Sequence, residues 1–312
     1  MENGKYSHLD TVILIFINYL MFFDKVFFKI FKVRSISKLE FVVGLKEDII
    51  FRKLNENKNK YPINKIFINS NKKIIWTAWF QGKESAPPLV KLCIESFSKI
   101  PDHQIIVVTS DNYKEYISLP KFIIKKFEKG IISYTAFSEL IRLELLSVYG
   151  GIWIDATVFI HKPVTVSLED EPFYTLKGVS SLKRGEFLGF VPVYFMGCRE
   201  KYDAVVEVRD YLFSYWEANN KQIDYFLIDY CFKLVYLTDI SFSKIMNSHP
   251  LVGADRFLLI NMINKEYNFS NLMKINSCKY GVFKLSNKYK LEEEDSSEKL
   301  TFWGHMLRNR SL

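Results

Sequence analysis

Residues 138–157 read SELIRLELLSVYGGIWIDAT, and this stretch decides the fold of the chain. Apolar residues recur near helical spacing over residues 135–149, which predicts an amphipathic helix. Gly150 and Gly151 follow, and glycine tolerates the positive φ that the end of a helix often requires. Residues 152–154 are too few for a helix and suit a buried strand. Asp155 is therefore expected at the carboxyl end of a strand, where open α/β sheets bind their ligands.

Two charged residues of the predicted helix, Glu139 and Arg142, are three positions apart and so share one helix face. A carboxylate and a guanidinium placed together could hold sugar hydroxyls or a phosphate. Plainer interpretations stay open, because Arg142 could form a salt bridge to Glu139 or lie in solvent, and Asp155 could simply cap the strand end. Paired charges at a strand end nevertheless favour a functional site.

The rest of the chain alternates between strand patterns and helix patterns. Strands are predicted over residues 73–79 and 104–109, and further sheet is predicted over residues 187–196. Helices are predicted over residues 87–99, 120–129, 201–217 and 222–237. The alternation in the first half of the chain predicts an α/β fold with a mostly parallel central sheet flanked by helices.

These residues resemble the motifs of the DXD-containing sugar transferases of the capsular polysaccharide synthesis type, a group similar to glycosyltransferase family 32. That family shows S-D-x-x-R followed by Y-G-G-x-[YW]-x-D-x-D. This chain has Ser138-Glu139-x-x-Arg142 followed by YGGIWIDAT, and its residues 73–82 resemble the family's first nucleotide-binding strand. The resemblance covers residues 72–163 and implies a GT-A-like nucleotide-diphospho-sugar transferase fold.

The resemblance also implies an activity, that of a glycosyltransferase in bacterial capsular or surface polysaccharide biosynthesis. Such an enzyme moves a sugar from a nucleotide-diphosphate donor, here expected to be a UDP-sugar, to a glycan or lipid-linked oligosaccharide acceptor. Retention of the anomeric configuration is implied as well. The rival interpretation is a catalytically weak protein of the same pathway, which binds sugar nucleotides or acts as a scaffold at the membrane surface.

The same resemblance implies which side chains act. Trp76 is expected to contact the nucleotide base, although it could equally be a core residue. Asp224 could orient an acceptor hydroxyl or act as its base, or it could complement the dipole of the helix predicted around it. The catalytic candidates are Asp155, Arg142, Glu139 and Asp224. The donor-binding candidates are Trp76, Ser138, Glu139, Arg142, Gly151, Asp155, Thr157 and Trp303.

The expected cofactor is a divalent metal ion, either Mn²⁺ or Mg²⁺. These ions prefer hard oxygen ligands, often one or two carboxylates together with substrate phosphates. Thr157 stands where the family often has its second Asp, which puts the use of a metal in question. Asp155 and His305 are the predicted metal ligands, although His305 and Trp303 could be ordinary packing near the chain end. Alternatively, Arg or Lys side chains bind the charge of the leaving diphosphate.

Composition limits the possible partners. The chain has 312 residues with 48% hydrophobic residues, which can bury a sizeable core. Its formal net charge of +8 suits an anionic donor or an anionic membrane surface. Nucleic acid is not expected as a partner, because no basic run is combined with a nucleic-acid-binding motif. The four cysteines are scattered, which fits a reduced, cytoplasmic setting.

The N-terminal region predicts contact with a membrane. Residues 12–23 are apolar except for Asn18, and the basic residues Lys25, Lys29, Lys32 and Arg34 follow. This pattern suits an interfacial helix on the cytoplasmic face of the inner membrane, although a helix packed on the protein's own body is an alternative. An Asn- and Lys-rich linker is predicted over residues 51–68. We therefore expect an N-terminal helical region over residues 1–60 and a GT-A-like glycosyltransferase domain over residues 61–312.

Overall fold

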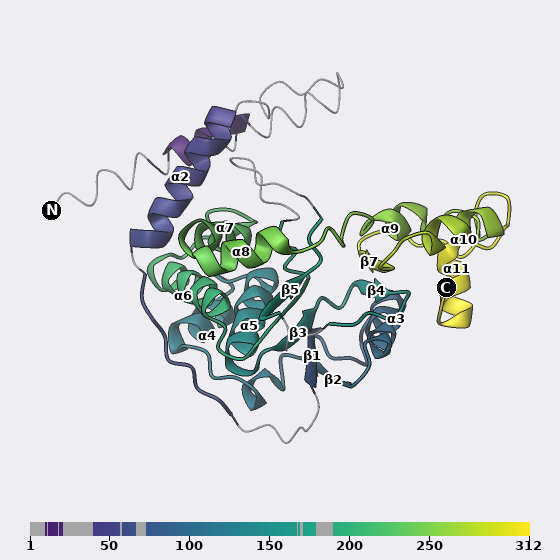
Figure 1. The fold of residues 1–312 in the computed structure, drawn as a ribbon, viewed down its shortest axis with the longest axis horizontal. Coiled ribbons are helices and arrows are strands. Elements are labelled where there is room, and N and C mark those ends of the chain that lie inside the picture. The colour runs from purple at the N-terminus through teal and green to yellow at the C-terminus, as the bar shows by residue number, and fades with distance from the viewer. Residues whose placement is uncertain are drawn as a thin grey trace.

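A computed structural model describes residues 10, 12–17, 19–20, 40–56, 58–66, 73–166, 168, 171–178 and 190–312. Its centre is a five-stranded sheet built from β1 (Lys73–Ala78), β2 (His103–Val108), β3 (Gly151–Ile154), β5 (Phe173–Thr175) and β6 (Phe195–Cys198) (Figure 1). The strand order is β2-β1-β3-β6-β5. Strand β1 pairs in parallel with β2 and β3, whereas β6 pairs antiparallel with β3 and β5. Four of these five strands run in one direction, so the predicted mostly parallel sheet is confirmed.

Helices cover both faces of this sheet (Figure 1). Alternate side chains of β1 and β3 point to opposite faces, as the pleat requires. Trp76 and Trp153 join the larger core cluster with the helices of one face, whereas Ile75 and Ile152 join the cluster beneath the other face. The first face carries α4 (Lys121–Glu128), α5 (Tyr134–Tyr149), α6 (Asp203–Ala218), α7 (Leu227–Thr238) and α8 (Ile240–Ser248), together with the 3-10 turn Tyr113–Glu115. The second face carries α3 (Pro88–Ser96), which continues into the 3-10 turn Phe97–Lys99.

The C-terminal part of the chain forms a small layer outside α3. Strands β4 (Val158–Ile160) and β7 (Val282–Lys284) make a second, antiparallel sheet in which Val158 lies opposite Lys284. This register brings Lys284 beside the end of β3. Three helices complete the layer, and their apolar residues cluster with those of α3. They are α9 (Leu258–Met262), α10 (Phe269–Asn276) and α11 (Phe302–Asn309), on the right of Figure 1.

The glycine pair between α5 and β3 is required by close packing. Gly150 has φ 66° and Gly151 has φ 88°, and residues other than glycine rarely adopt this backbone conformation. A Cβ atom on Gly150 would lie 2.5 Å from the backbone nitrogen of Glu200, and one on Gly151 would lie 2.5 Å from the carbonyl oxygen of Ile74. The predicted helix end and strand start are confirmed here, and the glycines let β3 enter the sheet directly after α5.

Two predicted elements differ from the structure. The helix predicted over residues 222–237 begins only at Leu227, because the Asp224 side chain accepts a hydrogen bond from the backbone of Phe226 and holds a local turn. The sheet predicted over residues 187–196 begins only at Phe195, and residues 187–189 lie outside the described part of the chain. Pro192 precedes this strand, and a proline cannot donate to a strand ladder.

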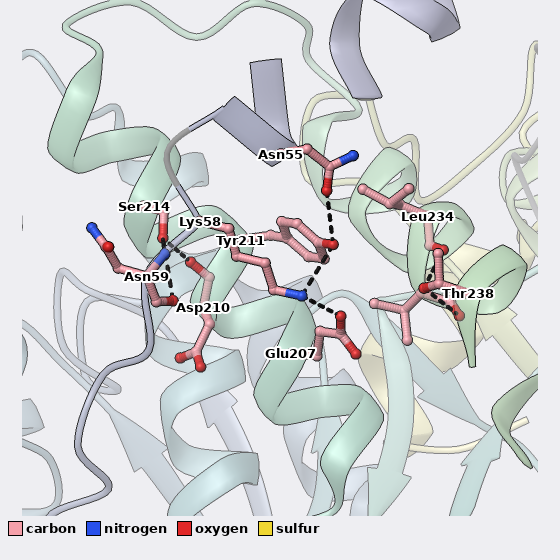
Figure 2. A network of polar contacts seen from close by, with 10 residues as sticks. Asn55, Lys58, Asn59, Glu207, Asp210, Tyr211, Ser214, Leu234 and Thr238 are labelled. Carbon is pink, nitrogen blue, oxygen red and sulfur yellow. Dashed lines mark hydrogen bonds and ion pairs between the residues drawn. The ribbon is translucent and has the colours of Figure 1, made fainter. Parts of the chain in front are cut away.

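The predicted linker over residues 51–68 is wrong for residues 51–56, whereas residues 58–66 have no regular secondary structure. Residues 51–56 are the end of α2 (Glu40–Glu56), whose Ile50 and Leu54 are buried in the larger core cluster. Lys58, Asn59 and Tyr61 then contact α6, and Figure 2 shows the first two of these contacts. The Asn59 backbone donates to Ser214 Oγ at 2.8 Å, and the Lys58 ammonium bonds both Glu207 and the Tyr211 hydroxyl. Hydrogen bonds therefore fix this segment to the body of the protein. The division of the chain at residue 60 stays a prediction.

The N-terminal segment is described only in part, since residues 21–34 of the predicted interfacial helix lie outside the described residues. Residues 12–17 are helical, with Leu14 and Ile17 buried and Val12, Ile15 and Phe16 exposed. Asp10 pairs with Arg52 of α2 at 3.3 Å, so this end of the chain contacts α2. Within the described residues, no helix is both long and apolar enough to cross a membrane. Contact with a membrane surface stays a prediction.

Candidate functional site

A pocket of about 870 Å³ opens at the carboxyl ends of β1 and β3, which are neighbouring parallel strands. Ligands of open α/β sheets bind at this edge, because the loops after the strands diverge there. Residues that follow β1 and β3 line the pocket together with one face of α5, the start of α7, and residues 192–194. The C-terminal layer adds Arg256, Phe257, Lys284, Asn287 and Lys288.

Asp155 is the centre of a network of charged groups. Its Oδ1 accepts hydrogen bonds from Arg142 Nη2 at 2.8 Å and from Trp153 Nε1 at 2.9 Å. Its Oδ2 accepts from Lys284 Nζ at 2.8 Å, and the same ammonium donates to Thr157 Oγ1 at 2.8 Å. The Arg142 guanidinium also lies over the Trp153 ring, with Cζ 4.9 Å from the ring centroid. One carboxylate therefore fixes two cations that come from distant parts of the chain.

These contacts keep the Asp155 carboxyl ionised. Burial by itself would raise the pKa of Asp155, because it disfavours the charged form. The Lys284 ammonium and the Arg142 guanidinium, together with the hydrogen bonds from Lys284 and Trp153, outweigh burial and lower the pKa below the ordinary value of 3.8. Asp155 therefore carries its negative charge at any physiological pH.

Two further carboxyl groups of the pocket, those of Glu139 and Asp229, have raised pKa values. Burial raises the pKa of Glu139 to about 8, against the opposing effect of Arg142, and the charges of Asp229 and Asp155 raise it further. Burial likewise raises the pKa of Asp229 to about 7, again opposed by Arg142. Glu139 is thus mostly protonated at pH 7, where it can donate a hydrogen bond as well as accept one. The pocket is therefore less acidic than its residue types suggest.

The raised pKa of Glu139 predicts a pH-dependent stability. Because the folded state holds this proton above the ordinary pKa of 4.5, stability is lost as the pH rises through the folded value of about 8. Glu139→Gln removes the titrating group, so we expect this variant to be more stable than the parent at pH 8.5, by up to about 4 kcal/mol. The difference should shrink towards pH 5.5.

Thermal unfolding of the parent protein and of the Glu139→Gln variant at pH 5.5, 7.0 and 8.5 measures this difference in stability. The exposed Glu115 provides a matched control, and Glu115→Gln should shift all three midpoints equally. A Glu139→Gln variant less stable than the parent at pH 8.5 would show that the carboxylate is satisfied in the folded protein.

Three pocket-lining side chains carry buried polar atoms without a hydrogen-bond partner in the described structure. These atoms are Trp79 Nε1, the Tyr194 hydroxyl, and Nε and Nη1 of Arg142. Buried polar groups are almost always hydrogen-bonded in folded proteins, so donors left open around one cavity indicate a polar ligand. Trp79 and Tyr194 were not predicted from the sequence. The available signal was the position of Trp79 at the end of the strand predicted over residues 73–79.

The pocket brings together half of the predicted site residues and excludes the others. Ser138, Glu139, Arg142, Asp155 and Thr157 all line it. Gly151 does not line the pocket, because it lies at the start of β3 rather than at its end.

Trp76 also lies outside the pocket. It is fully buried, donates from Nε1 to the Gly150 carbonyl at 3.0 Å, and packs edge-on against Tyr116. Strand alternation explains this position, since Trp76 faces the helices of the larger core cluster. The structure therefore places Trp76 in the core, whereas Trp79, three residues further along the chain, is one of the aromatic residues that line the pocket.

Asp224 is likewise outside the pocket, whereas Asp229 lines it. The Asp224 carboxylate pairs with Lys46 of α2. The turn at residues 224–226 delays the start of α7, and the delay changes which acidic residue faces the cavity. Of these two acidic residues, only Asp229 lines the pocket, and the role predicted for Asp224 stays a prediction.

Trp303 and His305 belong to the C-terminal layer. Trp303 is buried among the apolar residues of α3, α9, α10 and α11. His305 stacks on Tyr267, with ring centroids 3.6 Å apart. Neither residue lines the pocket, so the structure does not bring His305 to Asp155.

The side chains around Asp155, in their present arrangement, do not form a binding site for a divalent metal ion. The Lys284 ammonium lies between Asp155 Oδ2 and Thr157 Oγ1, the two oxygens that a cation at this motif would use. Among the described residues, no group of three His, Cys, Asp or Glu side chains is placed to hold a metal ion. An ion of the Mg²⁺ type needs several oxygen ligands at about 2.1 Å, and a neighbouring ammonium repels it.

Comparisons with known proteins identify a family and a solved structure that is similar to this chain. The family model described as "Capsular polysaccharide synthesis protein" matches residues 29–306. The solved structure titled "PaToxG Glycosyltransferase" is similar at 16% identity and a TM-score of 0.39, over 76% of this chain and 94% of that chain. A TM-score this low supports no conclusion about function. No curated protein matches the sequence significantly.

Proposed function

The chain belongs to the capsular polysaccharide synthesis protein family, and from this membership we propose that its pocket transfers a sugar from a nucleotide-diphosphate donor to a glycan acceptor. The family predicted from residues 138–157 is confirmed by the match over residues 29–306, and with it the glycosyltransferase class. The donor, the acceptor and the stereochemistry are parts of the proposal. The observation that carries it is the Arg142–Asp155–Lys284 network at the carboxyl ends of β1 and β3.

The charges of the pocket suit a diphosphate leaving group. Arg142, Arg256, Lys284 and Lys288 all line the cavity. Catalysis of sugar transfer needs developing negative charge on the diphosphate to be stabilised by groups that are already in position. Asp155 holds Arg142 and Lys284 in place through hydrogen bonds of 2.8 Å. In this proposal Asp155 positions the cations, and the cations bind the diphosphate.

The acidic side of the pocket suits the donor sugar. Ser138, Glu139 and Asp229 offer hydroxyl and carboxyl groups on the α5 and α7 walls. A carboxylate has about four lone-pair positions, and Asp155 already accepts from three donors, so one position is left for a sugar or ribose hydroxyl. The open Nε1 of Trp79 and the open Tyr194 hydroxyl are further donors for the same ligand.

Retention of configuration is the proposed stereochemical outcome. The bond between the anomeric carbon and the diphosphate oxygen breaks, and the acceptor oxygen bonds to the same face of that carbon. The acceptor proton passes to the leaving phosphate. Asp155 is held by three donors and is therefore a poor nucleophile, which favours this direct route over a covalent intermediate on that residue. Positioning of the two substrates then supplies much of the rate.

A lipid-linked acceptor would place the enzyme at the cytoplasmic face of a membrane. The exposed side chains of Val12, Ile15 and Phe16 support this part of the proposal, because they form an apolar face on a helix of a protein with a net charge of +8. The buried Leu14 and Ile17 attach the same helix to the body of the protein.

The deciding experiment is hydrolysis of a panel of UDP- and GDP-sugars by the full chain, with Mn²⁺, with Mg²⁺ and with chelator, in the presence of anionic liposomes. We expect release of the sugar from one donor, and sedimentation of the protein with the liposomes. Donor binding without any turnover, even with acceptor glycans added, would favour a sugar-nucleotide-binding protein without catalytic activity. Protein that stays in the supernatant would contradict the membrane contact and leave the transfer activity unaffected.

A further inference from the structure

We propose that Lys284 takes the place of the divalent cation in this pocket, so that the donor diphosphate is bound by side-chain cations alone. The inference rests on the proposed function and identifies how its active site binds the leaving group. It follows from the position of one ammonium group, from how that group is held, and from its neighbours.

The Lys284 ammonium binds the two side-chain oxygens of the motif. Lys284 Nζ donates to Asp155 Oδ2 and to Thr157 Oγ1, both at 2.8 Å. These are the side-chain oxygens at the first and third positions of the D-x-D-like motif. A metal ion bound by the same two oxygens would have to displace the ammonium, because like charges cannot share one oxygen pair without strong repulsion. The ammonium therefore occupies the cation position.

The backbone around Lys284 is fixed. Its N–H donates to the Arg256 carbonyl at 2.7 Å, and the N–H of Leu285 donates to the Thr157 carbonyl at 2.8 Å. Lys284 also pairs with Val158 in the β4–β7 ladder. The side chain keeps 22% of its surface exposed and lines the cavity, so a ligand can reach it. A lysine that served only to tie two strands together would not need this access.

Two other cationic residues line the pocket together with Lys284. Arg256 lines the same wall, donates from Nη1 to the Gly253 carbonyl at 2.9 Å, and lies over the Phe257 ring at 4.8 Å. Lys288 lines the cavity a short distance further along the chain. Arg256, Lys284 and Lys288 form a cationic wall that comes from the C-terminal layer, whereas the lining carboxyl groups of Glu139 and Asp229 come from α5 and α7. A diphosphate, with its several acceptor oxygens, matches such a wall.

Titration calorimetry of UDP and of GDP into the full-length protein tests the proposal. We expect the parent chain to bind one of these nucleotides in EDTA, and Mn²⁺ to change the affinity by less than about threefold. Lys284→Met keeps the length of the side chain and removes its charge, and it should weaken binding in EDTA by about 10- to 100-fold, the size typical of a lost charged hydrogen bond. Lys284→Arg, which keeps the charge, should restore most of the affinity.

Lys290 provides the matched control, because it lies close to Lys284 in the sequence, is 86% exposed and is not among the pocket-lining residues. Lys290→Met should bind as the parent does. Parental affinity in Lys284→Met, or a parent chain that needs Mn²⁺ for tenfold or more of its affinity, would overturn the inference while leaving the proposed function intact. Failure of the parent to bind either nucleotide, with or without Mn²⁺, would overturn both. The measurements on the parent do not depend on the folding of any variant.

Discussion

Asp155→Asn is expected to reduce sugar transfer by about 100-fold or more, the size of effect seen when one preorganised electrostatic group is removed from an active site. The asparagine keeps the shape of the side chain and can still accept from Arg142 and Trp153. It loses the negative charge that holds Lys284 Nζ at 2.8 Å. The amide NH2 group of the asparagine would point at the ammonium, and two hydrogen-bond donors cannot bond each other. The pocket would then lose the alignment of its cations. Initial rates with the donor found in the panel measure the effect.

The fold of this variant should survive, because Asp155 lines the pocket with a quarter of its side chain exposed. Thermal unfolding separates a loss of activity from a loss of structure. Asp203→Asn is the matched control, since Asp203 is exposed at the start of α6 and does not line the pocket. Sugar transfer at near-parental rates by Asp155→Asn would show that the Asp155 carboxylate is not needed for activity, and would contradict the proposed role of the Arg142–Asp155–Lys284 network.

Arg209→Met is expected to give the largest loss of stability, about 3 to 5 kcal/mol, which is the usual cost of leaving a buried charge without its partner. Arg209 belongs to α6 and is fully buried, and its guanidinium faces Glu144 of α5. It bonds Glu144 at 3.2 Å, Asp210 at 2.7 Å and the Tyr61 carbonyl at 2.7 Å. Its removal would strand two carboxylates and release the segment before β1. Chemical denaturation of the variant and the parent measures the difference.

The pH dependence of Arg209→Met identifies the cause. Burial raises the pKa of Glu144 to about 7, even though Arg209 opposes this. Without Arg209 the pKa should rise further, so the variant should regain stability as the pH falls below this range and Glu144 takes up its proton. The double variant Arg209→Met, Glu144→Gln should likewise lose less than Arg209→Met alone. A loss below about 1 kcal/mol in Arg209→Met would mean that this buried ion pair contributes little.

The local architecture of the site was predictable from short stretches of sequence. Helical spacing, the glycine pair and the short apolar run fixed α5, the turn and β3, and so placed Asp155 at a strand end. Helix and strand periodicities depend on neighbouring residues, and the close approach at Gly150 and Gly151 is a local backbone requirement. For the same reason the position of Glu139 and Arg142 on one helix face was predictable.

Errors arose where one local interaction shifted an element or where strand alternation set the direction of a side chain. The Asp224 turn moved the start of α7 and exchanged Asp224 for Asp229 at the pocket. Trp76 and Trp79 are both aromatic residues near the end of the first strand, but only Trp79 lies beyond the strand and lines the cavity. The sequence pattern did not distinguish these alternatives.

By itself, the sequence determined the family, the mostly parallel sheet, and the position of Asp155 at the carboxyl end of its central strand. Only the tertiary structure decided which cations Asp155 meets. Lys284 lies 129 residues further along the chain and reaches Asp155 through the antiparallel pairing of β4 with β7. No periodicity or motif records such a contact, because strand pairing between distant segments is set by how the whole chain packs its core. The acidic group could therefore be read from the sequence, whereas its partners depend on the fold.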